Sequence, residues 1–407
     1  MLSKCPIRIA LLAVTLVALA GVVVAQTTAL SPMEQLGKML FFDTNLSDPP
    51  GQACAFCHAP GVGFTGPDSA VNAAGAVYEG AVPGRFGNRK PPAAAYASGP
   101  VLYYDSVDGV WVGGTFWDGR ATGWTLGDPL AEQAQGPFLN PLEQNMASPA
   151  DVCLAVQASA YAALFEAVWG PGSLDCVSNV PLTYERIGRS IAAYERSTEV
   201  GPFTSKYDLY LAGQASLIAL EKKGLQLFEG KGKCALCHLS QPGPGGEPPM
   251  FTDFTYDNLG VPKNPLNPFY TMPPEYNPDG ADWIDYGFGA FLEAAGYGPD
   301  VYEPEIGKHK VPTLRNVALR PDNKFVKAYG HNGYFKSLKS IVHFYNTRDV
   351  LMSCDMQKNP KEGVNCWPPP EVAANVNITE LGNLALTDLE EDAIVEFLKT
   401  LSDGYKP

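Results

Sequence analysis

The sequence predicts an all-α protein of two domains in which helices are joined by long irregular loops. Gly and Pro account for 41 and 36 of the 407 residues, and the alternation of apolar and polar residues that marks strands is scarce. A five-residue pattern, C-x-x-C-H, occurs at residues 54–58 and again at 234–238. This repeat and the chain length place the domain boundary near residue 200.

Apolar residues at helical spacing predict four main helices, at residues 31–42, 181–197, 215–228 and 387–401. The last begins at a capping box made by Thr387 and Glu390, and we expect it to pack against the third. The stretches 59–99 and 242–299 are rich in Gly and Pro, which predicts irregular structure.

Residues 1–25 have the pattern of a secretory signal peptide. Lys4 and Arg8 give a positive start, residues 9–24 are almost wholly apolar, and Ala25 is a small residue suited to cleavage. The apolar run is shorter than the roughly 20 residues of a membrane-spanning helix, and no later segment is long and apolar enough to span. We therefore expect export to the periplasm, with residues 26–200 and 201–407 as the two mature domains.

Acidic residues dominate the mature chain. Without Lys4 and Arg8 it has 27 Lys and Arg against 43 Asp and Glu, a formal charge of −16. This charge argues against nucleic acid as a partner, since phosphates need a basic surface. It suits either simple solubility or the steering of a basic electron-donor protein.

The two C-x-x-C-H patterns are attachment signatures of c-type haem. The thiols add across the haem vinyl groups, and the adjacent imidazole is placed to ligate the iron. A zinc site would need a second Cys or His pair nearby, and a redox dithiol would sit in a strand-rich unit. The sequence therefore predicts two covalently bound haems, attached through Cys54, Cys57 and His58 and through Cys234, Cys237 and His238.

Four of the nine cysteines are left once Cys5 and the haem motifs are set aside. An even number in an exported protein predicts disulfides. Proximity in sequence favours the pairs Cys153–Cys176 and Cys354–Cys366, out of three pairings that are open.

Five further segments resemble the bacterial dihaem cytochrome c peroxidase and MauG family. They are LGKMLFFDTNLS before the first motif, FWDGRATG at 116–123, FTDFTYDNLGVP at 251–262, KVPTLRNVAL at 310–319 and HNGYFKSLKSIVHFYN at 331–346. Their shared order around two haem motifs covers almost all of the mature chain. The resemblance implies two cytochrome c-like haem domains. The haem of His58 would bind peroxide, and the haem of His238 would pass electrons in.

The resemblance also implies the groups around the peroxide. Gln133 and Glu143 are ten residues apart, as in the acid–base pair of the family. Glu143 would be the acid and base and Gln133 its positioning partner; otherwise they are an ordinary surface Gln and Glu. Trp117 matches a tryptophan between the haems and would relay electrons, the alternative being core packing. Arg120 would bind a haem propionate. The stretch from Trp117 to Gln133 is longer than the family pattern.

Histidine counts indicate how open each haem is. Peroxidases of the family that need reductive activation carry a removable His ligand after the first motif, and residues 59–237 contain no His. The haem of His58 is therefore expected to be open in every redox state.

The resemblance implies that the second axial ligand of the other haem lies fourteen residues after His331, at Tyr345. MauG has Tyr at this place and many peroxidases have Met. His343, Met352 and Met356 are the alternative ligands nearby.

Three other positions carry expectations. His331 would make a structural or propionate contact, and His309, between two lysines, is predicted on the surface. Asn88 matches a ligand of the calcium ion that the family holds between its haems, although the residues before His331 depart from the pattern.

These features predict a periplasmic dihaem peroxidase that reduces hydrogen peroxide to water with electrons from a small redox protein, either a cytochrome c or a copper protein. One alternative is MauG-like oxidation of side chains of a partner protein through high-valent haem. MauG uses a Trp where this chain has Gly232, which argues against a simple transfer of that reaction. The second alternative is a non-enzymatic dihaem electron carrier.

Overall fold

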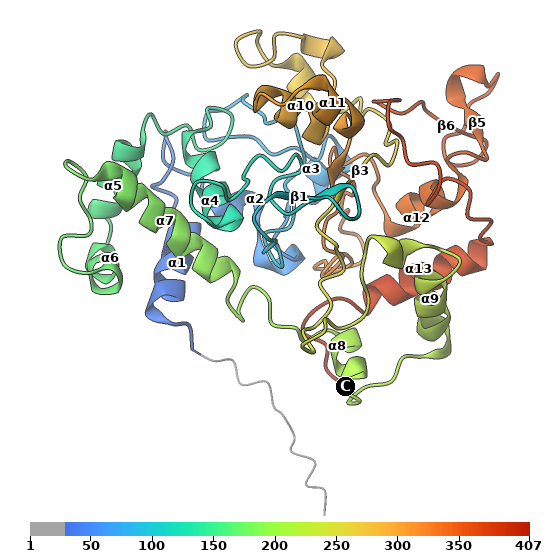
Figure 1. Cartoon of the computed structure of the whole chain (residues 1–407), viewed down its shortest axis with the longest axis horizontal. Helices are drawn as coiled ribbons and strands as arrows, with labels where there is room; N and C mark the ends of the chain where they lie inside the picture. Colours follow the sequence, from blue (N-terminus) through green and yellow to red (C-terminus); the bar gives the residue numbers. More distant parts are fainter. Residues whose placement is uncertain (1–28) are drawn as a thin grey trace, which may run out of the picture.

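The computed structural model describes residues 29–407, so the predicted signal peptide at 1–25 lies outside the described residues. The described chain is helical with long loops, and its strands form three two-stranded sheets (Figure 1). The prediction of an all-α fold is confirmed.

The thirteen α-helices of residues 29–407 are α1 (Pro32–Phe42), α2 (Cys54–Cys57), α3 (Ser69–Ala73), α4 (Pro129–Leu139), α5 (Pro149–Gln157), α6 (Ala162–Trp169), α7 (Val180–Glu195), α8 (Lys206–Leu211), α9 (Ala219–Glu229), α10 (Gly287–Ala294), α11 (Pro299–Tyr302), α12 (Leu338–Thr347) and α13 (Asp388–Lys399). The strands are β1 (Tyr103–Asp105), β2 (Val110–Val112), β3 (Tyr256–Asp257), β4 (His309–Lys310), β5 (Met352–Ser353) and β6 (Cys366–Trp367). The pairs β1–β2 and β3–β4 are antiparallel, and β5–β6 is parallel.

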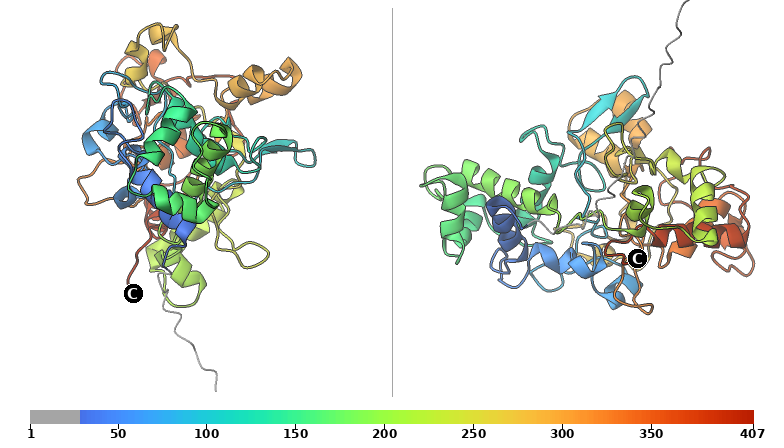
Figure 2. Two further views of the ribbon diagram at one scale, coloured as in Figure 1. Left: turned by 90° about the vertical axis from the view of Figure 1, so that its left-hand side faces the viewer. Right: turned by 90° about the horizontal axis from the view of Figure 1, so that it is seen from below.

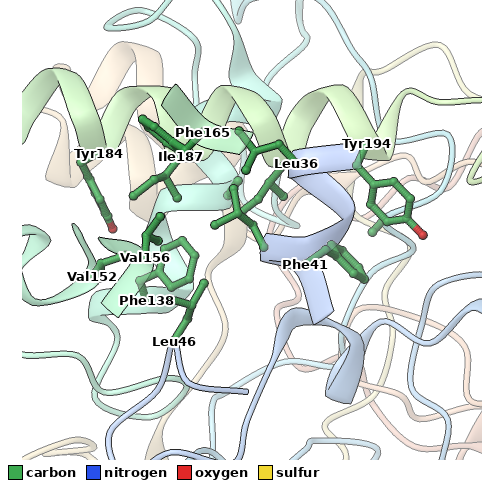
Figure 3. Close-up of a cluster of buried hydrophobic side chains, with 14 of the residues drawn as sticks. Leu36, Phe41, Leu46, Phe138, Val152, Val156, Phe165, Tyr184, Ile187 and Tyr194 are labelled. Atoms are coloured by element: carbon green, nitrogen blue, oxygen red, sulfur yellow. The ribbon is translucent and has the colours of Figure 1, made fainter. Parts of the chain in front are cut away.

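The first core forms where α1 crosses α7 (Figure 3). Gly37 allows this crossing, because a Cβ there would lie 1.8 Å from the carbonyl oxygen of Ser190. Buried Phe41 packs edge-on against Tyr194, with ring centroids 5.4 Å apart. Helices α4 and α5 also pack against α7.

The second core repeats this arrangement where α9 crosses α13, on the opposite side of the molecule in Figure 1. Gly224 stands at the crossing, and a Cβ there would lie 1.9 Å from the carbonyl oxygen of Ala393. Phe228 packs edge-on against Phe397 at 5.2 Å. The last helix therefore packs against the helix that leads into the second haem motif, as predicted.

The four predicted helices are present as α1, α7, α9 and α13, with one shifted start, and further helices such as α4, α5, α6, α10 and α12 were not predicted. The capping box of Thr387 and Glu390 starts α13 as expected. Helix α9 starts at Ala219 instead of 215, because the Glu221 carboxylate accepts the backbone N–H of Ile218 at 2.8 Å. The stretch 242–299 was expected to be irregular, but it contains α10, whose apolar residues pack beneath the β1–β2 hairpin.

Both predicted disulfides, Cys153–Cys176 and Cys354–Cys366, are formed. Across residues 29–407 we find no single helix with the length and apolar composition to cross a membrane, although α5 and α6, bent by 106°, pass that test as a pair.

Candidate functional site

The first haem motif forms a single helical turn that ends on its histidine. Helix α2 spans Cys54–Cys57, and His58 caps it. His58 Nδ1 lies 3.2 Å from the backbone oxygen of Phe64, a group that only accepts, so Nδ1 carries the proton. Burial lowers the pKa of His58 to about 4. A neutral imidazole with Nδ1 fixed in this way leaves Nε2 free as a metal ligand.

The second motif is built in the same way. His238 Nδ1 lies 2.8 Å from the backbone oxygen of Phe251, and burial lowers the pKa of this imidazole as well. Phe64 and Phe251 both have a positive φ, 57° and 53°, which is costly for an aromatic residue. In both turns this conformation directs the phenylalanine carbonyl toward the histidine of the motif.

The two motifs are linked by a crossed pair of backbone hydrogen bonds. Lys90 N–H, beside the first motif, donates to the backbone oxygen of His331 at 3.0 Å. Lys310 N–H, beside the second, donates to the backbone oxygen of Trp117 at 2.8 Å. Each half of the chain therefore contributes a backbone group to the surroundings of the other half's motif.

The described residues fit two covalently attached haems. Cys54, Cys57, Cys234 and Cys237 are the free cysteines of the described chain, and the other four form disulfides. Each motif opens on its own cavity, which Cys54, Cys57 and His58 line at the first site and Cys234, Cys237 and His238 line at the second.

Gln133 and Glu143 both line the His58 cavity, as the acid–base prediction requires. Gln133 lies on α4, and Glu143 lies in the turn that follows this helix. Asn140 Nδ2 donates to Glu143 Oε1 at 2.9 Å and so orients the carboxyl. Burial is the main influence on Glu143 and raises its pKa. Neither Gln133 nor Glu143 is therefore an ordinary exposed surface residue.

Tyr345 lines the His238 cavity from helix α12, together with Cys234 and Cys237. The three alternative ligands do not line it. His343 Nδ1 pairs with Glu391 at 2.8 Å, and Met352 and Met356 are exposed. Burial raises the pKa of the Tyr345 phenol; a bound cation reverses that effect.

Trp117 is buried where the two cavities meet and lines both of them. Its indole Nε1 donates to the backbone oxygen of Lys90 at 2.8 Å, which fixes the ring. The imidazole of His331 lies edge-on to this ring, with centroids 6.5 Å apart. The sequence argument thus located the residue that lies between the sites.

Arg120 lines the His58 cavity, and its side chain is 41% exposed and pairs with Asp118 at 2.8 Å. That Arg120 contacts a haem propionate stays a prediction. A less exposed arginine of the same cavity is Arg89, 10% exposed, which binds Asp118 and Asp285 at 2.6 Å each.

The prediction that His309 lies on the surface is wrong. His309 is buried and its ring stacks on that of His331, with centroids 3.6 Å apart and planes at 9°. Its Nε2 lies 3.3 Å from Asp285. These three residues do not form a metal site, because lone pairs of two parallel rings cannot converge on one ion, and Arg89 already occupies the carboxylate. The sequence did not indicate this burial, because His309 lies between two lysines and lysine is mostly exposed.

Asn88 lies at the edge of the His58 cavity, and its backbone oxygen accepts a hydrogen bond from Asn267 at 2.8 Å. Its neighbours Arg89 and Lys90 are buried cations, which oppose a further cation nearby. Calcium at Asn88 stays a prediction.

Two charged residues that the sequence reading missed line the His58 cavity. Glu195 on α7 is buried, and its Oε2 has no partner among the described residues; burial raises its pKa to about 8. Lys90 is buried against Thr65, and burial lowers its pKa to about 8. Glu195 shows no signal in the sequence beyond its place on an amphipathic helix.

Several known proteins are similar to this chain over most of its length. A sequence profile described as di-haem cytochrome c peroxidase matches residues 31–216. The chain is 36% identical to the methylamine utilization protein MauG of Paracoccus denitrificans, covering 91% of this chain and 89% of that protein. It is 30% identical to cytochrome c551 peroxidase of Nitrosomonas europaea, covering 78% and 74%.

A solved structure gives the same result. The diheme peroxidase BthA of Burkholderia thailandensis superposes with a TM-score of 0.72 at 30% identity, covering 93% of this chain and 88% of that one. With two haem-attachment motifs, two cavities and these relatives, the chain belongs to the di-haem cytochrome c peroxidase family, whose members are oxidoreductases that act on peroxide.

Proposed function

We propose that this protein is a periplasmic dihaem peroxidase that reduces hydrogen peroxide to water with electrons from a small redox protein. The observation that carries the proposal is the difference between the cavities. Glu143 and Gln133 line the cavity of His58, and Tyr345 lines that of His238. A site that reacts with peroxide needs a proton-transferring group, and a site that only passes electrons does not.

Glu143 would take the proton from the peroxide oxygen that is bound and return it to the oxygen that leaves as water. Burial raises its pKa, which makes proton return easier than from an exposed carboxyl. The amide of Gln133 would hold the peroxide in position. His58 and His238 would hold the haem irons, which when bound exchange electrons with peroxide and donor.

Electrons would come in at the site of His238 and Tyr345 and cross near Trp117. A tyrosine ligand would close this site to peroxide, and phenolate favours ferric iron. Trp117 suits the crossing because it lines both cavities. Arg120, at the mouth of the His58 cavity, would contact a propionate.

We also propose that residues 26–200 and 201–407 are the two domains. The two helix crossings support this division, because one core draws mainly on residues before 200 and the other on residues after it.

A second candidate is oxidation of side chains in a partner protein, as proposed above for MauG-like enzymes. The identity of 36% with a methylamine utilization protein MauG and the place of Tyr345 favour it. A plain electron carrier is disfavoured, because it needs no proton-transferring Glu143.

The test mixes the fully oxidised holoprotein with peroxide and records EPR and absorption spectra. We expect one open and one closed haem before mixing and an immediate change after it, followed by turnover when reduced cytochrome c is added. Two closed haems and no change on mixing would refute the proposal. Reaction without any turnover by small redox proteins would favour the second candidate.

A further inference from the structure

A cluster of aromatic rings connects the region between the two sites with the protein surface. It is made by the β1–β2 hairpin, strand β3 and helix α10, with the loop after α10. In the right-hand view of Figure 2 the blue-green hairpin lies against the orange helices, away from both helix crossings. None of these rings belongs to the peroxide site described above.

The inner end of the cluster is Tyr256, which is buried beside the segment of Trp117. A Cβ at Gly119, two residues after Trp117, would lie 2.2 Å from the Tyr256 hydroxyl oxygen. Strand β4 joins the same two residues, because Lys310 pairs with Tyr256 in the sheet and donates its N–H to the Trp117 carbonyl at 2.8 Å. The Tyr256 hydroxyl donates to the backbone oxygen of Gly113 at 2.6 Å.

From Tyr256 the rings follow one another in contact. Tyr256 stacks on Phe288 with centroids 4.0 Å apart and planes at 13°. Phe288 contacts Trp111 at 5.7 Å. Trp111 then contacts Tyr104 at 5.5 Å and Tyr297 at 5.6 Å. No aliphatic gap interrupts this series.

The series ends on two exposed aromatic side chains. Tyr104 is 52% exposed, and Trp124, which contacts Tyr297 at 6.5 Å, is 48% exposed. Tyr103 provides a comparison within the same strand. It is 47% exposed, but among residues 29–407 it takes part in none of the ring contacts that build the cluster. Tyr103 and Tyr104 are therefore about equally exposed, but Tyr104 is in contact with the cluster and Tyr103 is not.

We propose that this cluster is a second route for electrons, from aromatic reductants at Tyr104 and Trp124 inward to the region of Trp117. Tryptophan and tyrosine are the side chains that give up an electron most readily. Phe288 does not, and it would only bridge Tyr256 and Trp111. Simple packing would not require large aromatic side chains to continue to the solvent. The proposal rests on peroxide reduction as the proposed function.

The chemistry balances with a phenolic reductant such as hydroquinone. Peroxide takes two electrons and two protons and leaves as two waters. Hydroquinone gives up two electrons in two steps, releases two protons to solvent and becomes quinone. Without a reductant, the electrons come from the exposed rings themselves, and each ring that loses two electrons gains a hydroxyl group from water and releases two protons.

The experiment treats the oxidised holoprotein with peroxide in the absence of a donor and maps hydroxylated residues by peptide mass spectrometry. We expect hydroxylation of Tyr104 and Trp124, little at Tyr103, and protection by hydroquinone. In Trp111→Phe we expect hydroxylation of Tyr104, whose ring contacts Trp111, to fall about tenfold, which corresponds to about 1.4 kcal/mol on the barrier, with an unchanged haem spectral response to peroxide. Trp124 also contacts Phe291, which contacts Phe288, so its hydroxylation should fall less. Trp169→Phe, on α6, is the matched control and should behave as the wild type.

Equal hydroxylation of Tyr103 and Tyr104, or no effect of Trp111→Phe, would overturn the route, because free peroxide or solvent radicals would then explain the modification. If Trp111→Phe does not fold, Tyr256→Phe keeps a ring stacked on Phe288 and removes the inner tyrosine, and it should lower hydroxylation of Tyr104 and Trp124 alike. Absence of any haem response to peroxide would instead refute the proposed function and this route with it.

Discussion

The two halves of this chain share one frame and differ in what that frame surrounds. Gly37 lets α1 cross α7 as Gly224 lets α9 cross α13. Each motif histidine is held by a phenylalanine carbonyl at a positive φ, and each half passes a lysine N–H to the other. The backbone that holds a haem is therefore nearly the same at both sites.

The difference lies in the side chains that line each cavity from other parts of the same half. In the first half α4 brings Gln133, and the turn after it brings Glu143. In the second half α12 brings Tyr345. One cavity therefore has a carboxyl and the other a phenol, and in the proposed function this difference separates peroxide chemistry from electron transfer.

The largest expected effect comes from Glu143→Gln. The amide keeps the shape of the side chain but cannot take a proton, so we expect the rate of reaction with peroxide to fall by about 10²–10⁴-fold. Stopped-flow absorption of the holoprotein measures this rate. The control is Glu195→Gln, which changes a second buried carboxyl in the same cavity and should have a small effect on the rate. An equal loss of rate in both variants would contradict the proposed role of Glu143.

The pH dependence of the same rate is a separate test of Glu143. Burial raises its pKa, and the first step needs the deprotonated carboxylate. We therefore expect the rate to decrease as the pH falls through this raised pKa, at a higher pH than for an exposed glutamate. The decrease should be absent from Glu143→Gln, and a decrease that persists there belongs to another group.

The second effect concerns stability where the two halves meet. Arg89→Met leaves the buried carboxylates of Asp118 and Asp285 without their main partner, so we expect a loss of about 3–5 kcal/mol in the free energy of unfolding. Arg120→Met, which removes an exposed partner of Asp118, should cost at most about 1 kcal/mol. Urea unfolding of the holoprotein measures both.

Arg89 also holds the pKa of Asp285 well below its ordinary value, against the effect of burial. A lowered pKa stabilises the fold above the unfolded-state pKa and loses that contribution as the pH falls through the folded-state pKa. In Arg89→Met burial should raise the folded-state pKa of Asp285 toward or above its unfolded-state value, so the part of the stability loss at low pH that comes from Asp285 should shrink. An unchanged loss of stability at low pH would show that other carboxylates determine it.

Local patterns predicted much of this frame. The haem motifs, the main helices and both disulfides depend on short spacings, and the Gln133 and Glu143 pair followed from a resemblance. The burial of His309 and the partner of Arg89 could not be predicted, because Arg89 and Asp285 are 196 residues apart. Helix α10 was missed because its Gly-rich sequence is stabilised by packing on Trp111 and Tyr256, contacts that helical propensity does not contain.

A smaller effect on stability tests whether the two crossings are equivalent. Gly37→Ala and Gly224→Ala each place a methyl group against a backbone carbonyl of the facing helix, and overpacking of this kind costs about 1–3 kcal/mol. We expect similar losses in the free energy of unfolding. A loss in only one variant would show that the halves tolerate helix displacement differently.

The smallest effect on peroxide chemistry is expected from Tyr345→Phe, the variant that separates the two halves most cleanly. The rate of reaction with peroxide should stay near that of the wild type, because Tyr345 lines only the His238 cavity. The low-spin EPR signal of the second haem should change, because phenylalanine offers no oxygen to iron. Met352→Leu, at an exposed alternative ligand, should leave that signal intact. An unchanged signal in Tyr345→Phe would mean that the second site is closed by another group, and the exchange of carboxyl for phenol between the halves would then no longer explain their division of labour.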